Sequence, residues 1–310
     1  MLSEVNPGWL GPGDYTAFLN RVFPGQWDLK AYDWYIARGF NGRRGDLLIQ
    51  AQDCSIRSGF ALVPRQIVVD DGAPIDAGIV CAAATLPEER GRGRYAQLLQ
   101  AAIECGRQRG YVALLGFVTA DNPSGRGLLR IGARAIPSYY ILSPGRRHAR
   151  AIPRERIDTR VTLDAVAAQV RQWCGRRSLR PGMPQAHFHY AERGDWERQF
   201  LYRPHAMRAV RVRHDCVALV ESVRSTDRLQ CLACPDDRTT ASIAALAAAS
   251  LDGGQSFFMY TLDASQAAAA RRLGLKVREG YLLLLPTGHR SDRWDALAAA
   301  RWHVQSGDRL

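Results

Sequence analysis

The stretch "TLPEERGRGRYAQLLQAAIECGRQRG", residues 85–110, carries most of the information about the fold. It places Arg90-Gly91-Arg92-Gly93-Arg94 between an apolar run and a run whose apolar residues recur at helical spacing. Glycines permit positive φ and let the backbone approach a ligand closely. The first turn of a helix offers N–H groups without intrahelical partners and a partial positive charge. The stretch therefore predicts a main-chain anion site at a strand-to-helix junction, with arginines around it.

The spacing of this loop excludes two common phosphate motifs. A dinucleotide fingerprint needs the order G-x-G-x-x-G and an acidic residue after the next strand, and both are missing. A P-loop ends in Gly-Lys-Ser/Thr, but the chain's only lysines are Lys30 and Lys276. The loop does match the pattern Gln/Arg-x-x-Gly-x-Gly/Ala, read as Arg90-x-x-Gly93-x-Tyr95.

With this pattern the chain resembles the GCN5-related N-acetyltransferase (GNAT) superfamily. Residues 84–116 have the family's order of strand, Pro87 ahead of the loop, helix, glycine turn and next strand. The stretch "DNPSGRGLLRIGA", residues 121–133, stands where the family has Asn…Ser…x-x-Gly-Phe, with Gly132-Ala133 in place of Gly-Phe. The resemblance covers roughly residues 15–145. It implies an α/β (α+β) fold with a mixed central sheet flanked by helices.

The second half of the chain repeats the order of the first. Gly132 and Gly274 each follow an expected helix, and each precedes a tyrosine, Tyr139 or Tyr281, by seven residues. We expect two tandem GNAT-like units, with an unrelated α/β partner as the alternative. The expected division is a catalytic unit over 1–145, a linker over 146–160 and a degenerate unit over 161–310.

The second unit lacks the basic glycine loop. The stretch "CPDDRTTAS", residues 234–242, stands in its place, and the two aspartates would repel a diphosphate. We therefore expect no coenzyme in the second unit. The last stretch, "RWHVQSGDRL" at 301–310, is expected to pack back onto it.

The resemblance implies a coenzyme and its contacts. In this family the loop amides hold the pyrophosphate of coenzyme A, so acetyl-CoA or another acyl-CoA is the implied donor. The N–H of Thr85 would face the thioester carbonyl, and Asn122 would contact the pantetheine arm. The implied reaction is direct transfer from the thioester to the amine of a small metabolite. The implied coenzyme-binding residues are Thr85, Leu86, Arg90, Gly91, Arg92, Gly93, Arg94, Tyr95 and Asn122.

The family's catalytic acid has no direct counterpart. Family members often carry a tyrosine four residues before the glycine of Gly-Phe, and Leu128 stands there in this chain. Tyr139 and Ser124 are the candidate hydroxyls for protonating the leaving thiolate. No carboxylate stands out as the base, and Glu88 and Glu89, just before the loop, are expected to be solvated surface charges.

The formal net charge of +12 favours an anionic partner and leaves two other readings open. One is an acyltransferase that draws its acyl group from acyl carrier protein or aminoacyl-tRNA. The other is a sensor or scaffold that binds acetyl-CoA without turnover, which the leucine at position 128 supports. A diphosphate loop favours a free coenzyme or a phosphopantetheine arm, so we do not expect a nucleic-acid partner.

Metal and membrane sites are not indicated. The "HFH" at 187–189 and the pair Cys231 and Cys234 lack the second half of a zinc pattern, so no metal site is expected. The longest uncharged runs are strand-sized, and the N-terminal stretch does not have the pattern of a signal peptide. We expect a cytoplasmic protein without a membrane span.

Overall fold

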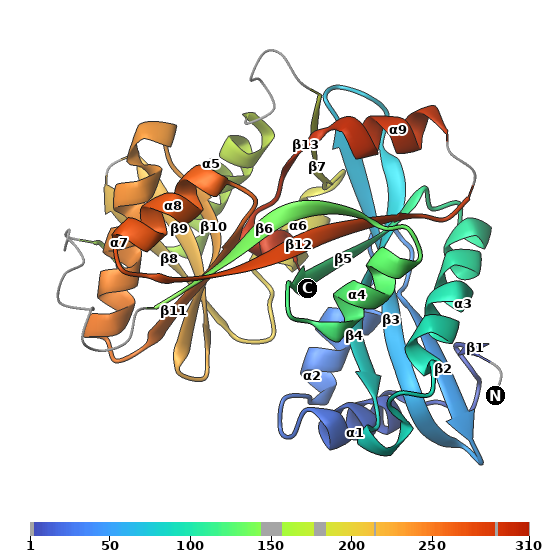
Figure 1. Ribbon diagram of the computed structural model, residues 1–310. Helices are drawn as coiled ribbons and strands as arrows, with labels where there is room; N and C mark the ends of the chain where they lie inside the picture. The colour runs from blue at the N-terminus through green and yellow to red at the C-terminus, as the bar shows by residue number, and fades with distance from the viewer. Residues whose placement is uncertain (1–2, 144–156, 177–183, 214, 289–290, 310) are drawn as a thin grey trace. The chain divides into compact units, whose positions relative to one another are not determined.

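The structure, a computed structural model, describes residues 3–143, 157–176, 184–213, 215–288 and 291–309. The described chain forms two compact units (Figure 1). Unit 1 comprises 1–136 and 282–300, and unit 2 comprises 137–281 and 301–309. Most of the expected linker at 146–160 lies outside the described residues, so the boundaries at 145 and 161 stay a prediction.

The sheet of unit 1 is mixed. Its strand order is β1-β2-β3-β4-β5-β12, where the last part of β12 belongs to this unit. Neighbours from β1 to β4 are antiparallel, and β4 and β5 are parallel. Asp53, Cys54 and Asp70 have positive φ in the two hairpin turns. The strands are β1 (Glu4–Val5), β2 (Asp46–Gln52), β3 (Ser55–Val69), β4 (Ile75–Thr85), β5 (Ala113–Thr119) and β12 (Lys276–Pro286).

Helices and short turns flank this sheet. Two helices precede the long strands near the N-terminus, and a π-helical turn, η1, follows the second of them. Tyr15 and Phe18 of the first pack with Leu47 and Ile49 of the sheet in one buried cluster. The elements are α1 (Pro12–Val22), α2 (Leu29–Tyr32), η1 (Asp33–Ala37), the 3-10 turn η2 (Pro87–Glu89), α3 (Arg94–Gln108), α4 (Pro123–Arg130) and α9 (Asp292–Ala299).

The strands of unit 2 also run in mixed directions. Strands β6, β11, β10, β9 and β8 follow one another in that order, and β13 pairs with β7. The expected packing of 301–310 onto this unit is confirmed for 301–309. The elements are β6 (Arg134–Leu142), α5 (Leu163–Arg176), β7 (Gln185–His189), α6 (Arg193–Phe200), β8 (Ala206–Arg213), β9 (Cys216–Val223), β10 (Thr226–Ala233), α7 (Asp236–Asp252), β11 (Ser256–Thr261), α8 (Ala264–Arg272), β13 (Arg301–His303) and the 3-10 turn η4 (Ser306–Asp308).

Two parallel strands diverge in unit 1. Strands β4 and β5 pair from Ala77↔Ala113 to Ile79↔Leu115. Both strands lie wholly within the described residues, and they form no further pairs with each other although β4 continues to Thr85. We call this divergence the strand split of unit 1. It removes β5 as a hydrogen-bonding partner for the second half of β4.

Unit 2 contains the same feature. Strands β10 and β11 pair in parallel from Thr226↔Ser256 to Arg228↔Phe258. No later pair joins them in this fully described part of the chain, although β10 continues to Ala233. We call this the strand split of unit 2. The repeated detail supports the prediction of two copies of one fold.

The predicted fold class is confirmed, because each unit has a mixed sheet with helices packed on it. The two glycines of the predicted repeat, Gly132 and Gly274, both adopt positive φ directly after a helix. Within the described residues, no helix has the length and apolar character needed to cross a bilayer.

Candidate active site

A β-bulge redirects β4 where the strand split opens. The register against β3 passes from Gly59↔Ala84 to Ala61↔Cys81, which leaves two residues of β4 opposite one residue of β3. Ala82 lies there with φ of 49°, a left-handed conformation that is uncommon for a residue with a Cβ. The hydroxyl of Tyr15, fully buried in α1, donates to the Ala82 carbonyl at 3.0 Å. Bulges of this kind bend a strand, and this one lies just beyond Ile79↔Leu115, the last pair that β4 forms with β5.

Sequence reasoning missed this bulge. The run of three alanines at 82–84 contains none of the turn residues that signal an irregular strand. The structural cause is tertiary, since the hydrogen bond from Tyr15 comes from 67 residues away in sequence.

The glycine loop has the geometry that the sequence predicted. Gly91 and Gly93 have φ of +77° and +73°, and an added Cβ at either would meet no described atom within 4 Å. Gly93 is the N-cap of α3 and offers no side-chain cap. Gln97 donates to the Gly93 carbonyl at 3.2 Å, so the intrahelical ladder begins there. The N–H groups of the first turn therefore lie at a helix end with positive potential and no capping side chain.

The loop arginines have different roles. Arg94 forms an ion pair with Glu89 at 2.6 Å, and its side chain is only 12% exposed. Arg92 lies 3.5 Å from the same carboxylate but is 63% exposed. Arg90 is exposed and directs its Nε towards the Thr85 carbonyl at 3.4 Å. The expectation that Glu89 is a solvated surface charge is wrong, because its side chain is buried under this pair.

Glu89 should make the stability of the protein sensitive to acid. The Arg94 guanidinium, by hydrogen bond and charge, holds the pKa of Glu89 below its ordinary value. A carboxyl whose pKa is lower in the folded state stabilises the fold above its unfolded pKa of about 4.3. That contribution disappears as pH falls through the folded-state pKa. We therefore expect the melting temperature of Glu89→Gln to fall less than that of the wild type when the pH is lowered from 7 to 3.

The matched control for this experiment is Glu104→Gln. Arg107 also lowers the pKa of Glu104, but this pair is exposed on α3 and is screened by salt. Its acid sensitivity should disappear at high ionic strength, whereas that of Glu89 should persist. If the melting temperatures of the wild type and of Glu89→Gln fall by the same amount between pH 7 and pH 3, the role given to Glu89 is contradicted.

Thr85 and Leu86 connect the strand to the loop. The Thr85 hydroxyl bonds to that of Ser58 at 2.7 Å, across the β3–β4 ladder. Leu86 is fully buried; its N–H donates to the Arg57 carbonyl at 3.0 Å and its carbonyl accepts from Glu89. Because both main-chain groups of Leu86 already have protein partners, Leu86 anchors the loop to the core.

The structure brings three of the predicted site residues together. The Tyr95 hydroxyl is hydrogen-bonded to Ser124, and burial raises the pKa of Tyr95 to about 12. The Tyr95 ring packs edge-on against Phe60, with ring centroids 6.2 Å apart. Asn122 caps α4 by accepting from the Ser124 N–H at 2.9 Å. The start of α4 is thereby tied to the first turn of α3.

The other two positions considered for proton transfer lie elsewhere. Leu128 is buried and packs towards Gly116, so it contributes apolar core. Tyr139 belongs to unit 2, where it pairs with Thr261 of β11 and has the Arg271 guanidinium 5.9 Å from its ring. Within unit 1, Ser124 is the candidate hydroxyl beside the loop.

Comparisons with known proteins identify the fold. No protein-family model matches the chain, and no curated protein matches it significantly. Among solved structures, a tandem GNAT protein from the clavulanic acid biosynthesis pathway matches with a TM-score of 0.63 at 14% identity, over 93% of this chain and 100% of that chain. The chain has the GNAT fold. The predicted tandem arrangement is confirmed at the level of the fold.

Two further structures with this fold are similar. A GCN5-related N-acetyltransferase from Sphaerobacter thermophilus has a TM-score of 0.58 at 14% identity, over 94% of this chain and 99% of that chain. The Saccharomyces cerevisiae N-myristoyltransferase with bound myristoyl-CoA has a TM-score of 0.60 at 9% identity, over 92% of this chain and 79% of that chain. Both matches extend over most of the chain, so the GNAT fold is not confined to the residues around the loop.

Proposed function

We propose that the chain is an acyl-CoA-dependent N-acyltransferase whose unit 1 binds the coenzyme, with acetyl-CoA as the donor. The observation that carries the proposal is the junction of β4 and α3. There two left-handed glycines, Gly91 and Gly93, open the helix beside a strand edge that has left its neighbour. The bound myristoyl-CoA of the yeast N-myristoyltransferase supports an acyl-CoA ligand on this fold.

In this proposal the loop amides bind the diphosphate and β4 binds the pantetheine arm. The N–H groups of residues 91–95 face the phosphates, and the exposed Arg90 and Arg92 add charge. Arg94 contributes by holding the loop through Glu89. The amide arm of pantetheine extends along β4 to Thr85 and is contacted by Asn122, because the strand split leaves that edge without β5.

The proposed reaction is a direct transfer. A neutral amine attacks the thioester carbon, a C–N bond forms, the C–S bond breaks, and the amine loses one proton while the thiolate gains one. The Thr85 N–H stabilises the oxyanion, and holding both reactants at one site makes the attack effectively unimolecular. Ser124, hydrogen-bonded to Tyr95 in unit 1, is the proposed proton donor to the thiolate.

The proposed acceptor is a small molecule that carries an amine. The tandem GNAT neighbour comes from the biosynthesis of a small molecule, clavulanic acid, which supports this class of acceptor over a protein. Two donors other than free coenzyme, acyl carrier protein and aminoacyl-tRNA, would suit the net charge of +12. The dependence of binding on ionic strength distinguishes a tRNA donor from free coenzyme, because binding of tRNA falls steeply as the salt concentration rises.

The test combines a binding and a turnover measurement. Calorimetric titration with coenzyme A should give one binding event per chain. Acetyl-CoA mixed with a panel of amino acids, amino sugars and polyamines should release free thiol with at least one of them. If the titration with coenzyme A gives no heat of binding, the proposal is contradicted, because every contact proposed above is a contact with the coenzyme.

A second candidate is a sensor that binds acetyl-CoA without turnover. The buried Leu128, at the family's tyrosine position, favours it. The sensor would be supported over the enzyme if the chain binds coenzyme but releases no thiol with any amine of the panel, and if Ser124→Ala changes neither result.

A further inference from the structure

The strand split of unit 2 is not followed by an anion site. After β10 the chain continues through Cys234 and Pro235 directly into α7. The Cys234 thiol is fully buried and lies 3.3 Å from the Ser242 hydroxyl. Arg238, in the first turn of α7, forms an ion pair with Asp215 at 2.5 Å. This junction therefore has neither the glycines nor the exposed arginines, Arg90 and Arg92, of the loop in unit 1.

Residues 305–309 bridge the two diverging strands of unit 2. The Tyr260 N–H of β11 donates to the Ser306 hydroxyl at 3.2 Å. The Leu232 N–H of β10 donates to the Gln305 side-chain oxygen at 3.5 Å. Both donors lie beyond the last β10–β11 pair, Arg228↔Phe258. The segment thus supplies hydrogen-bond acceptors to each strand where the other strand no longer does.

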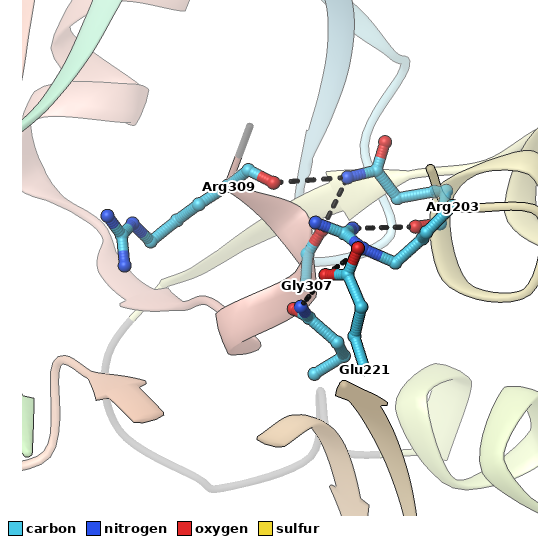
Figure 2. Close-up of polar contacts among 6 residues, drawn as sticks. Arg203, Glu221, Gly307 and Arg309 are labelled. Atoms are coloured by element: carbon cyan, nitrogen blue, oxygen red, sulfur yellow. Dashed lines mark hydrogen bonds and ion pairs between the residues drawn. The ribbon is translucent and has the colours of Figure 1, made fainter. Parts of the chain in front are cut away.

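Gly307 seats the segment closely against the unit. A Cβ added there would lie 2.6 Å from the ring of Phe200 and 3.0 Å from the Gln230 carbonyl, so only glycine fits. The Gly307 carbonyl accepts from Arg203 at 3.3 Å and also from the side chain of Gln199 (Figure 2). Two side-chain donors therefore hold the backbone of the segment at this residue.

A buried ion pair holds the donor in place. Arg203 binds Glu221 at 2.9 Å, with side-chain exposures of 3% and 0% (Figure 2). Gln230 donates to the same carboxylate oxygen at 2.6 Å, and Arg203 also donates to the Gln199 carbonyl at 2.9 Å. Additional hydrogen bonds lower the cost of burying such a pair, and here the Gly307 carbonyl is one of the acceptors for Arg203, although the Oε1 of Glu221 has no described partner.

The last two residues of the segment add polar and aromatic contacts. Tyr190 donates to Asp308 at 2.6 Å, and the other oxygen of Asp308 accepts from the Gln305 N–H at 2.6 Å. The Arg309 guanidinium lies over the rings of Tyr140 and Tyr260, 4.7 and 4.5 Å from their centroids. The segment is bound by main chain, charge and aromatic surface together, as a peptide ligand would be.

We infer that the strand split of unit 2 is a peptide-binding site, and that residues 305–309 are its built-in ligand. The site corresponds in the fold to the strand split of unit 1, where we propose that the pantetheine arm binds; in this comparison the inference rests on the proposed function. In unit 1 the proposed partner of the exposed strand edge is a coenzyme that binds and dissociates. In unit 2 the corresponding edge is met by the chain itself, which closes this unit to coenzyme.

The first test displaces the segment in the full chain. Gly307→Leu places a side chain where Phe200 and the Gln230 carbonyl leave no room. Hydrogen exchange at the Leu232 and Tyr260 amides should become about tenfold faster or more, with unit 1 unchanged. The control is Gly194→Leu in α6 of the same unit, where an added Cβ meets no described atom within 4 Å. Exchange at both amides as slow in Gly307→Leu as in the control would overturn the inference.

The second test supplies the ligand in trans. A chain that ends at Val304 should lose protection at the same two amides and recover it when the peptide Gln-Ser-Gly-Asp-Arg is added. The same peptide with leucine at its glycine should have no effect. If neither Gly307→Leu nor the shortened chain folds, Ser306→Ala removes only the acceptor of the Tyr260 N–H. Unchanged exchange of that amide in Ser306→Ala would then overturn the inference.

Coenzyme titration separates this inference from the proposed function. Gly307→Leu should bind one coenzyme A per chain with the wild-type affinity, because the binding residues lie in unit 1. If the wild-type chain binds no coenzyme, but hydrogen exchange at the Leu232 and Tyr260 amides still becomes faster when the segment is displaced, the proposed function is contradicted and the peptide site is supported. Binding of two coenzyme A molecules per wild-type chain would show that residues 305–309 do not close unit 2 to coenzyme.

Discussion

Valine in place of Gly93 is expected to weaken coenzyme A binding by about a hundredfold or more. Gly93 has φ of +73°, which a β-branched residue adopts only under strain. Relief of that strain turns the N–H groups of the first turn of α3 away from the phosphates. Losing two hydrogen bonds to a charged group costs about 3 kcal/mol or more, which corresponds to that factor.

Gly110→Val is the matched control for this prediction. Gly110 ends α3 with φ of +74°, and an added Cβ there also meets no described atom within 4 Å. Both variants should lose a similar amount of melting temperature because the backbone strain is the same. Only Gly93→Val should lose coenzyme binding by calorimetry. Equal affinities in the two variants would show that the loop does not hold the coenzyme.

Methionine in place of Arg203 is expected to destabilise unit 2 by about 3–5 kcal/mol. The change leaves the Glu221 carboxylate, which is fully buried, without its positive partner. It also removes one donor from the Gly307 carbonyl. A loss of this size should lower the melting temperature by about 10 °C.

Two companion variants show whether the buried charge is the cause. Arg193→Met removes an exposed partner of Glu197 on α6 and should change stability by no more than about 1 kcal/mol. Adding Glu221→Gln to Arg203→Met removes the stranded charge and should recover part of the lost melting temperature. A double variant as unstable as Arg203→Met would assign the loss to packing instead.

The sequence predicted the local features of the candidate site well. The glycine loop, the helix after it and the glycine at its end were all expected, and Gly91, Gly93 and Gly110 have the left-handed φ that those roles require. These features depend on residues that are neighbours in sequence, so their pattern is visible in one chain. The repeat was visible for the same reason, through Gly132 and Gly274.

The charges around the loop were predicted less well. Arg90, Arg92 and Arg94 look alike in sequence, but Arg94 is committed to a buried Glu89 while Arg92 is largely exposed. Which arginine takes the carboxylate depends on how the turn Pro87–Glu89 packs against the core through Leu86. A run of alternating charges does not contain that information.

By itself, the sequence determined a GNAT-like order of elements, present in two copies, and it predicted a main-chain anion site in the first copy. Only the tertiary structure decided that 282–300 joins unit 1, that Tyr15 holds the bulge at Ala82, and that residues 305–309 fill the strand split of unit 2. The physical reason is the range of the interactions. Turns and helix ends follow from adjacent residues, whereas these three contacts join segments far apart in the chain and form only when the sheets have assembled.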